Sequence, residues 1–308
     1  MKRAFGSILT GMLLLTVLQS NGLAQPEPEK QTINAADGWP LKITYYPSPG
    51  DRESPVVIMI PEADGINSLT QSVYKTLATR LQAKKFAVVT VDLRKHGDSV
   101  PADVDENDRR MKLVPTDYQA MAGMDLVAVK NFLLTEHEKE KLNIRKLAIV
   151  SAGKSCVVSN VFAAADWAQK PWNDAPVPAL RTPRGQDVQA LVMLSPEYTL
   201  RGMTTHTQAM RFLSDPGKNI AVRIFRNETN RVEKSTTDRV FKLFDLKDKD
   251  TLEARKVISV PNPQDSSGDR LLELRGGKGT IELIELFLTE FVEKRETPWR
   301  TRKSKLER

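Results

Sequence analysis

Short apolar runs alternate with amphipathic segments along most of the chain. Runs rich in β-branched residues, or with alternating apolar positions, predict strands over residues 39–46, 56–60, 86–91, 147–150, 190–194, 220–225 and 257–260. Apolar residues at helical spacing predict helices over residues 68–83, 116–134, 154–167, 236–244 and 280–294. Short buried runs separated by helices are typical of parallel strands. The pattern therefore predicts an α/β fold, with a mostly parallel, twisted sheet of about seven to eight strands and helices on both faces.

The first 24 residues have the organisation of a secretory signal peptide. Lys2 and Arg3 precede an apolar core over residues 5–18, and the small-residue exit Gly22-Leu23-Ala24 favours cleavage after residue 24. The apolar core is shorter than the about 20 residues that a transmembrane helix needs, although an uncleaved anchor is the alternative. We therefore expect export to the periplasm or the cell exterior, with no transmembrane segment after signal removal.

The remaining chain divides into a polar linker (25–33), one large domain (34–297) and a basic tail (298–308). Its single cysteine, Cys156, excludes an intramolecular disulfide. The formal net charge is +7, and we expect the basic tail to be solvated, with anionic lipid or polysaccharide as an alternative partner. No basic segment alternates with aromatic residues, so nucleic acid is not an expected partner.

The most informative local feature is the sharp passage from the strand at 147–150 into the helix at 154–167. Small residues at such a bend are typical of the nucleophile elbow, Gly-x-Ser-x-Gly, in which the nucleophile has a strained backbone. The five corresponding positions read Ser151, Ala152, Gly153, Lys154 and Ser155. Gly153, which has no side chain, stands at the position of the nucleophile.

The run Phe86–Ser99 ends in Asp-Leu-Arg-Lys-His-Gly-Asp-Ser. It resembles the strand and loop ending in Asp-x-Arg-Gly-His-Gly-x-Ser of secreted bacterial α/β hydrolases of the dienelactone-hydrolase and acyl-esterase type. The segments at 37–47, 56–65 and 194–198 are similar to that family's opening strand pair, its oxyanion loop and the strand after the elbow. The resemblance covers about residues 34–295, and it implies the α/β-hydrolase fold with a serine, an acid and a histidine in that chain order.

At all three catalytic positions the chain departs from the family. Gly153 replaces the nucleophile, Asn230 lies nearest the position of the acid, and Lys278 stands where the histidine is expected. Glu228 could supply the acid if the loop were shifted by two residues. In the oxyanion loop, Glu62 introduces a carboxylate that would oppose a developing oxyanion.

Only three histidines exist to replace the missing base. His96 belongs to the loop in which the family's histidine is structural, and His137 lies at a charged helix end. His206 is the one candidate for a relocated base, because histidine is the usual general base. The sequence thus favours the absence of any catalytic residue.

Lys154 and Ser155 lie at the predicted start of a helix, where free N–H groups and the helix dipole favour an anion. We therefore expect a small anionic ligand in the cleft, with a vestigial, solvated turn as the alternative. A phosphate loop is not predicted, because Ala148 stands where that motif requires glycine. Cys156 is expected to be buried and inert.

The carboxylates of the oxyanion loop have no histidine or cysteine beside them, so neither a metal nor a cofactor is expected. The sequence predicts an exported, catalytically inactive α/β-hydrolase-like protein that binds a small ligand or an envelope partner. The predicted binding residues are Glu62, Gly153, Lys154, Ser155, Asn230 and Lys278. The alternatives are an active serine esterase or peptidase with a relocated catalytic site, and a scaffold without a ligand.

Overall fold

The computed structural model describes residues 25–65, 68–105, 108–244, 254–260, 266–273 and 279–307. The predicted signal peptide (1–24) and Lys278 lie outside these residues. None of the helices in the described part of the chain is both long and apolar enough to cross a membrane.

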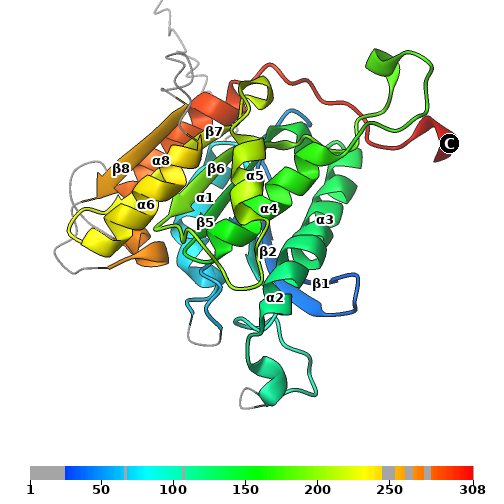
Figure 1. The fold of residues 1–308 in the computed structure, drawn as a ribbon. Coiled ribbons are helices and arrows are strands. Elements are labelled where there is room, and N and C mark those ends of the chain that lie inside the picture. Colours follow the sequence, from blue (N-terminus) through cyan, green and yellow to red (C-terminus); the bar gives the residue numbers. More distant parts are fainter. Residues whose placement is uncertain are drawn as a thin grey trace, which may run out of the picture.

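Eight strands form one sheet in the spatial order β1-β2-β4-β3-β5-β6-β7-β8 (Figure 1). β2 pairs antiparallel with β1 and with β4, and all other neighbours are parallel. The strands are β1 (Glu29–Asn34), β2 (Pro40–Tyr46), β3 (Val56–Ile60), β4 (Ala87–Asp92), β5 (Leu147–Ala152), β6 (Val188–Leu194), β7 (Ala221–Asn227) and β8 (Arg255–Val260). This mostly parallel sheet confirms the predicted fold class.

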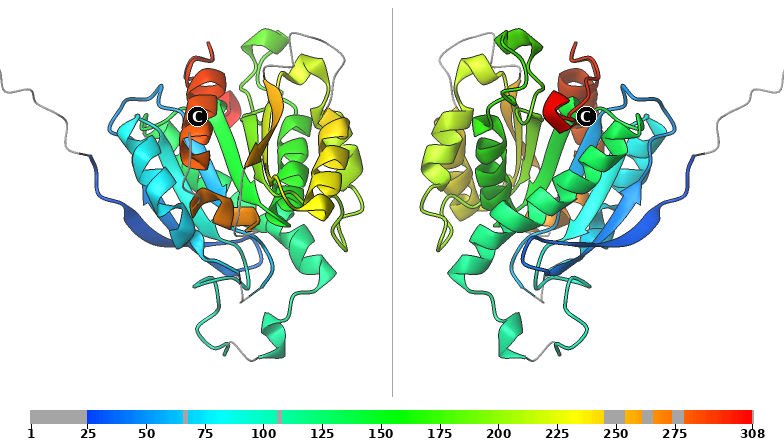
Figure 2. Two further views of the ribbon diagram at one scale, coloured as in Figure 1. Left: turned by 90° about the vertical axis from the view of Figure 1, so that its left-hand side faces the viewer. Right: turned by 90° about the vertical axis from the view of Figure 1, so that its right-hand side faces the viewer.

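Helices cover both faces of the sheet (Figure 2). They are α1 (Lys75–Ala83), α2 (Pro115–Ala120), α3 (Leu126–Glu138), α4 (Ser155–Ala168), α5 (His206–Leu213), α6 (Arg231–Phe244) and α8 (Thr280–Leu288). Two π-helical turns, Met121–Asp125 and Thr289–Glu293, join α2 to α3 and extend α8. Short 3-10 turns are Gln71–Tyr74, Arg109–Met111, Ile144–Lys146, Pro178–Leu180, Pro216–Lys218, Gly268–Glu273 and Lys305–Glu307.

The central strand β3 shows how the sequence builds two apolar layers. All five of its residues are buried, and alternate side chains enter opposite layers. Val56, Ile58 and Ile60 pack in the layer that contains α3, α4, α5 and α6, whereas Val57 and Met59 face α1 and α8. Each fully buried side chain of this size contributes about 1.5–3 kcal/mol, so the sheet is held firmly from both sides.

The segment predicted as a polar linker instead contains a strand. β1 pairs with β2 along its whole length, from Glu29 opposite Tyr45 to Asn34 opposite Pro40. Its residues are exposed or half-buried because β1 is the edge strand, and Ile33 packs against the margin of one apolar layer. Polar composition concealed the strand because backbone pairing needs few apolar side chains.

The C-terminal segment, predicted as a solvated tail, packs on the body of the protein. It runs from the end of α8 to the loop between α4 and β6 (Figure 1). The centroid of the indole ring of Trp299 lies 4.9 Å from that of the His137 imidazole. Arg302 forms an ion pair with the buried Asp187. Asp187 also pairs with Lys130 at 2.7 Å. The basic residues of this segment are therefore not all solvated, because Arg302 pairs with a buried acid.

Candidate functional site

The turn between β5 and α4 lies at the carboxyl edge of the sheet, and Gly153 occupies its bend with a φ of +49°. This left-handed backbone costs an L-residue with a side chain roughly 1–2 kcal/mol, so glycine fits it without strain. The N–H of Gly153 donates to the carbonyl of Leu194, which ties the bend to the neighbouring strand β6.

The side chain of Glu62, from the loop after β3, occupies the space above Gly153. A Cβ atom built on Gly153 would lie 2.5 Å from Cδ of Glu62, and one built on Gly268 would lie 3.2 Å from its Oε2. Gly268 also has a left-handed backbone, with a φ of +61°. The carboxyl group of Glu62 therefore fits between two glycines, in the space that a side chain at position 153 would take.

A second carboxyl group, that of Asp269, holds this loop. Its Oδ2 accepts from the N–H of Glu62 at 2.8 Å, and its Oδ1 accepts from the hydroxyl of Tyr74 at 2.6 Å. Burial raises the pKa of Asp269 to about 6, although these two donors oppose the shift. Burial, followed by the nearby charge of Asp269, also raises the pKa of Glu62. Both carboxyl groups therefore resist ionisation more than exposed ones do.

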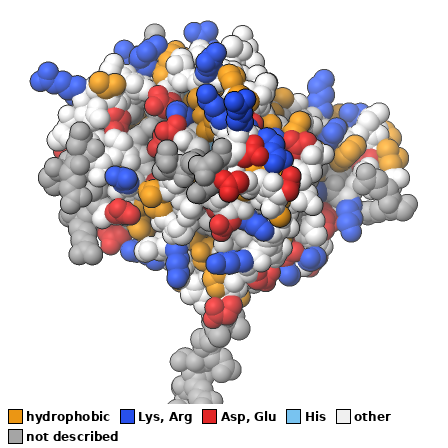
Figure 3. Space-filling view, turned by 90° about the horizontal axis from the view of Figure 1, so that it is seen from below, with side chains coloured by type: hydrophobic (Ala, Val, Ile, Leu, Met, Phe, Trp, Pro, Cys, Tyr) orange, Lys and Arg blue, Asp and Glu red, His pale blue; other side chains and the backbone are white. Residues whose placement is uncertain are grey.

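A cleft of about 230 Å³ opens above the two glycines. Its described lining has three carboxyl groups and no lysine, arginine or histidine: Glu62, Gly153, Ser195, Pro196, Glu197, Asn230, Val232, Glu233, Thr236, Ser267 and Gly268. Seen from this edge, the wider surface carries interspersed acidic and basic side chains (Figure 3).

On one wall of the cleft, Glu233 of α6 joins three other segments. Its carboxylate accepts from the hydroxyls of Ser195 and Ser267, both at 2.7 Å, and from the N–H of Asn227 at 2.6 Å. The Oγ of Ser195 also accepts from the N–H of Gly268 at 2.8 Å. Ser195 has a left-handed φ of +48°, so this network holds a strained backbone in place.

Of the predicted binding residues, Glu62, Gly153 and Asn230 meet in the cleft. The Oδ1 of Asn230 accepts from two N–H groups at the start of α6, so this side chain caps a helix. Glu228, the alternative acid, is exposed and does not line the cleft.

The structure places the remaining two described residues elsewhere. Lys154 forms an ion pair with Asp64 beside the cleft. Ser155 is buried, and its hydroxyl donates to the carbonyl of Pro61 at 2.5 Å. The hydroxyl of Ser155 is therefore committed to the β3 loop and does not face a ligand.

In all three histidines, both ring nitrogens contact polar groups other than hydroxyls. In His96, Nε2 accepts from the N–H of Gly65 and Nδ1 bonds a carbonyl, and His137 lies between two backbone carbonyls. In His206, Nδ1 bonds a carbonyl at 2.9 Å and Nε2 lies 3.2 Å from the amide of Asn160. Burial lowers the pKa of His206 to about 4. None of these rings forms a hydrogen bond with a serine hydroxyl that it could activate, within the described part of the chain.

The described residues contain no group of three or more histidine, cysteine, aspartate or glutamate side chains that could hold a metal ion. Cys156 is fully buried, and burial raises the pKa of its thiol far above the usual range. A buried thiol of this kind is a poor nucleophile.

The strand order and the sharp turn from β5 into α4 together decide the architecture. The fold is that of the α/β hydrolases. A dienelactone hydrolase from Anabaena variabilis matches with a TM-score of 0.57 and 14% identity, over 87% of this chain and 99% of that chain. Esterase 2 of Thermogutta terrifontis, phosphorylated by paraoxon, matches with a TM-score of 0.53 and 16% identity, over 86% and 95% of the two chains. A scan of protein-family models and a search of curated proteins found no match. At these identities the likeness establishes the fold alone.

The backbone N–H of Glu62 can be compared with the backbone donors that hydrolases of this fold use. Hydrolases of this fold stabilise the oxyanion with the N–H of the residue after the nucleophile and an N–H from the loop after the third strand. Here the N–H of Glu62, in the loop after β3, donates to the carboxyl group of Asp269. The N–H of Glu62 is therefore already engaged by the carboxyl group of Asp269.

The sequence pattern could not have revealed Tyr74, Ser195, Glu233 or Asp269 as parts of this site. None belongs to a recognisable motif, and the bonds of Asp269 span 195 and 207 residues. Only the strained turn after β6, with Ser-Pro at its start, offered a local signal.

Proposed function

We propose that this chain is an exported α/β-hydrolase-fold protein that does not catalyse acyl transfer. Its cleft above Gly153 instead binds a small molecule or a protein of the cell envelope. The observation that carries the proposal is the carboxyl group of Glu62, which fills the space of the missing nucleophile. Acyl transfer needs an activated hydroxyl or thiol beside a base, and the three histidines are engaged elsewhere.

The lining of the cleft argues against the anionic ligand expected from the helix start at Lys154. Glu62, Glu197 and Glu233 present carboxyl groups, and the ammonium group of Lys154 is paired with Asp64. Like charges within a partly desolvated cleft repel, so a neutral or positively charged group is favoured there. Calorimetric titration with butylamine and with butyrate tests this preference. Tighter binding of butyrate would contradict it.

Hydrolysis of a panel of p-nitrophenyl esters, from acetate to hexanoate, tests the lack of catalysis. We expect no turnover above buffer for the mature protein, whose folding is checked by circular dichroism. The variants Ser155→Ala and His206→Ala provide the comparison. Turnover that either substitution abolishes would show a relocated active site and would overturn the proposal.

A relocated serine hydrolase site is the alternative, and the contact between Ser195 and Glu233 is the observation that favours it. Ser195 lines the cleft on a strained turn, and its hydroxyl donates to a carboxylate at 2.7 Å. Two features weigh against it. Pro196 has no N–H to stabilise an oxyanion, and two further donors engage Glu233. Ester turnover that is present in the native protein and lost in Ser195→Ala would establish this alternative.

A further inference from the structure

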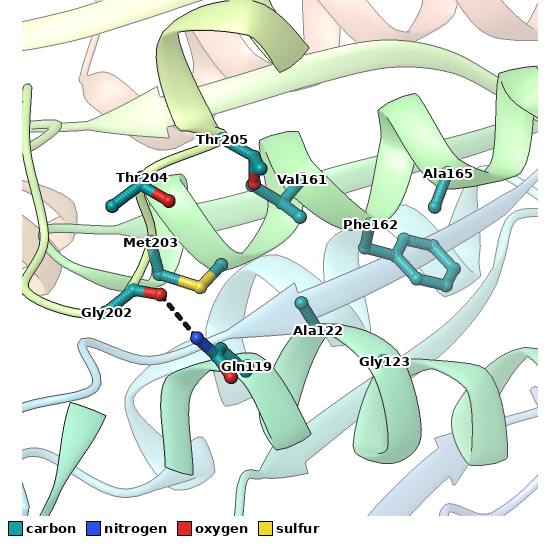
Figure 4. Close-up of a pocket in the computed structure, with 10 residues that line it drawn as sticks. All are labelled: Gln119, Ala122, Gly123, Val161, Phe162, Ala165, Gly202, Met203, Thr204 and Thr205. Atoms are coloured by element: carbon teal, nitrogen blue, oxygen red, sulfur yellow. Dashed lines mark hydrogen bonds between the residues drawn. The ribbon is translucent and has the colours of Figure 1, made fainter. Parts of the chain in front are cut away.

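A second cavity lies between α4 and the π-helical turn that joins α2 to α3 (Figure 4). Its volume is about 260 Å³, and it shares no lining residue with the cleft above Gly153. It is therefore a separate feature of the fold, and an inference about it is independent of the proposed function.

The lining of this cavity is apolar in its depth and polar only at its rim. The side chains of Phe162, from α4, and Met203, from the loop before α5, are 3% and 5% exposed and project toward the cavity from different elements (Figure 4). Thr204, Thr205 and Gln119 provide the polar groups, and Nε2 of Gln119 donates to the carbonyl of Gly202 at 2.8 Å. None of the described residues that line the cavity has a charged side chain, although 28% of the chain is charged.

The π-helical turn forms one wall of the cavity. A π turn inserts one extra residue into a helix, and such turns are frequent at functional sites. The turn ends at Asp125, whose carboxylate accepts from Nη2 of Arg94 at 2.6 Å and from its backbone N–H at 3.0 Å. On the cavity side the turn presents only Ala122 and Gly123. Gly123 is exposed, and a Cβ atom built on it would meet no heavy atom within 4 Å, so this wall has open space beside it.

We propose that this cavity binds a small uncharged molecule that carries one aromatic ring or a short aliphatic chain. The volume sets the size of the ligand, because an apolar cavity of about 150 Å³ accepts benzene, whereas sites for drug-sized ligands begin at about 300 Å³. The absence of charge from the lining excludes carboxylates and ammonium groups, which would lose hydration without gaining a partner. One hydroxyl or amide group on the ligand can bond the threonine hydroxyls at the rim.

Binding of benzyl alcohol and indole to the full protein tests the proposal, with benzoate and benzylamine as charged counterparts. The readout is the ¹³C-methyl signal of Met203 by NMR, assigned with Met203→Leu. We expect saturable shifts with the uncharged probes and binding at least tenfold weaker with the charged ones. No saturable shift, or equal binding of benzoate, would overturn the proposal.

The variant Gly123→Val adds a side chain at a position that lines the cavity. Met124→Leu alters the next residue of the same turn, which is outside the lining. We expect Gly123→Val to weaken binding at least tenfold and Met124→Leu to leave it within twofold. Ala165→Leu narrows the cavity from α4 and replaces Gly123→Val if that variant fails to fold. Undiminished binding by a folded, cavity-filled variant would place the probe elsewhere and refute the assignment.

Discussion

Replacing Gly153 with alanine tests directly whether the carboxyl group of Glu62 occupies the space that a side chain at position 153 would take. The new methyl group would lie 2.5 Å from Cδ of Glu62, so the carboxyl group must move to an unfavourable conformation, at a cost of about 1 kcal/mol. The left-handed backbone at Gly153 costs alanine roughly a further 1–2 kcal/mol. We therefore expect Gly153→Ala to lower the free energy of unfolding by about 2–3 kcal/mol.

A double-mutant cycle separates these two contributions. In a Glu62→Ala background the obstruction is gone, so Gly153→Ala should cost only the backbone part, giving a coupling free energy of about 1 kcal/mol. Gly38→Ala is the matched control, because Gly38 also has a left-handed φ, +83°, but a Cβ there meets nothing within 4 Å. Urea unfolding of each variant at pH 7 measures these free energies. Additivity of Gly153→Ala and Glu62→Ala within about 0.3 kcal/mol would refute the steric argument.

Three further predictions concern a buried acid, the C-terminal segment and the cysteine. Because the pKa of Asp269 is raised from 3.8 to about 6, its ionisation destabilises the fold. As the pH falls from 7 to 4, the free energy of unfolding of the native protein should therefore rise by about 2.4 kcal/mol relative to that of Asp269→Asn. Urea unfolding at each pH measures this difference, and the same pH dependence in both proteins would contradict the prediction. Arg302→Ala should lower the free energy of unfolding by about 3 kcal/mol, because it removes a buried partner of Asp187. The control Lys303→Ala, at an exposed position, should change this free energy by less than about 0.5 kcal/mol. Equal effects of the two substitutions would indicate that the C-terminal segment is solvated, as the sequence predicts. Cys156 should react with a disulfide reagent at pH 8 only after unfolding in urea, and rapid reaction in the native protein would show that the thiol is accessible.

Most of the fold could be predicted from the sequence because its strands are buried on both faces. The run Val56–Ile60 and residues 147–150 of β5 are apolar throughout, and this pattern does not depend on the conformation of the loops. β1 could not be predicted because it lacks such an apolar run: an edge strand held by backbone pairing can be almost entirely polar. The C-terminal segment was missed for a related reason: its basic residues look solvated until the buried acids that they pair with are placed.

Part of the candidate site could likewise be predicted from the sequence, and part of it could not. The bend at Gly153 could be predicted, because the strand, the small residues and the helix are adjacent in sequence. The position of the Glu62 carboxyl group could not, because it depends on how the loop after β3 packs against the β5–α4 turn and on Gly268 from a distant segment. Ser155 was predicted as a binding residue for the same reason: the sequence does not show that its hydroxyl donates to the carbonyl of Pro61.

Reaction with a fluorophosphonate probe tests the central claim most directly, because the probe modifies activated serines whatever their natural substrate. The purified protein, incubated with excess probe at pH 7.5, is analysed by intact mass spectrometry beside an active serine esterase. The account predicts an unchanged mass for this protein and one adduct on the esterase. A stoichiometric adduct that requires the folded state, at Ser195 or any other serine, would contradict it and establish a working nucleophile.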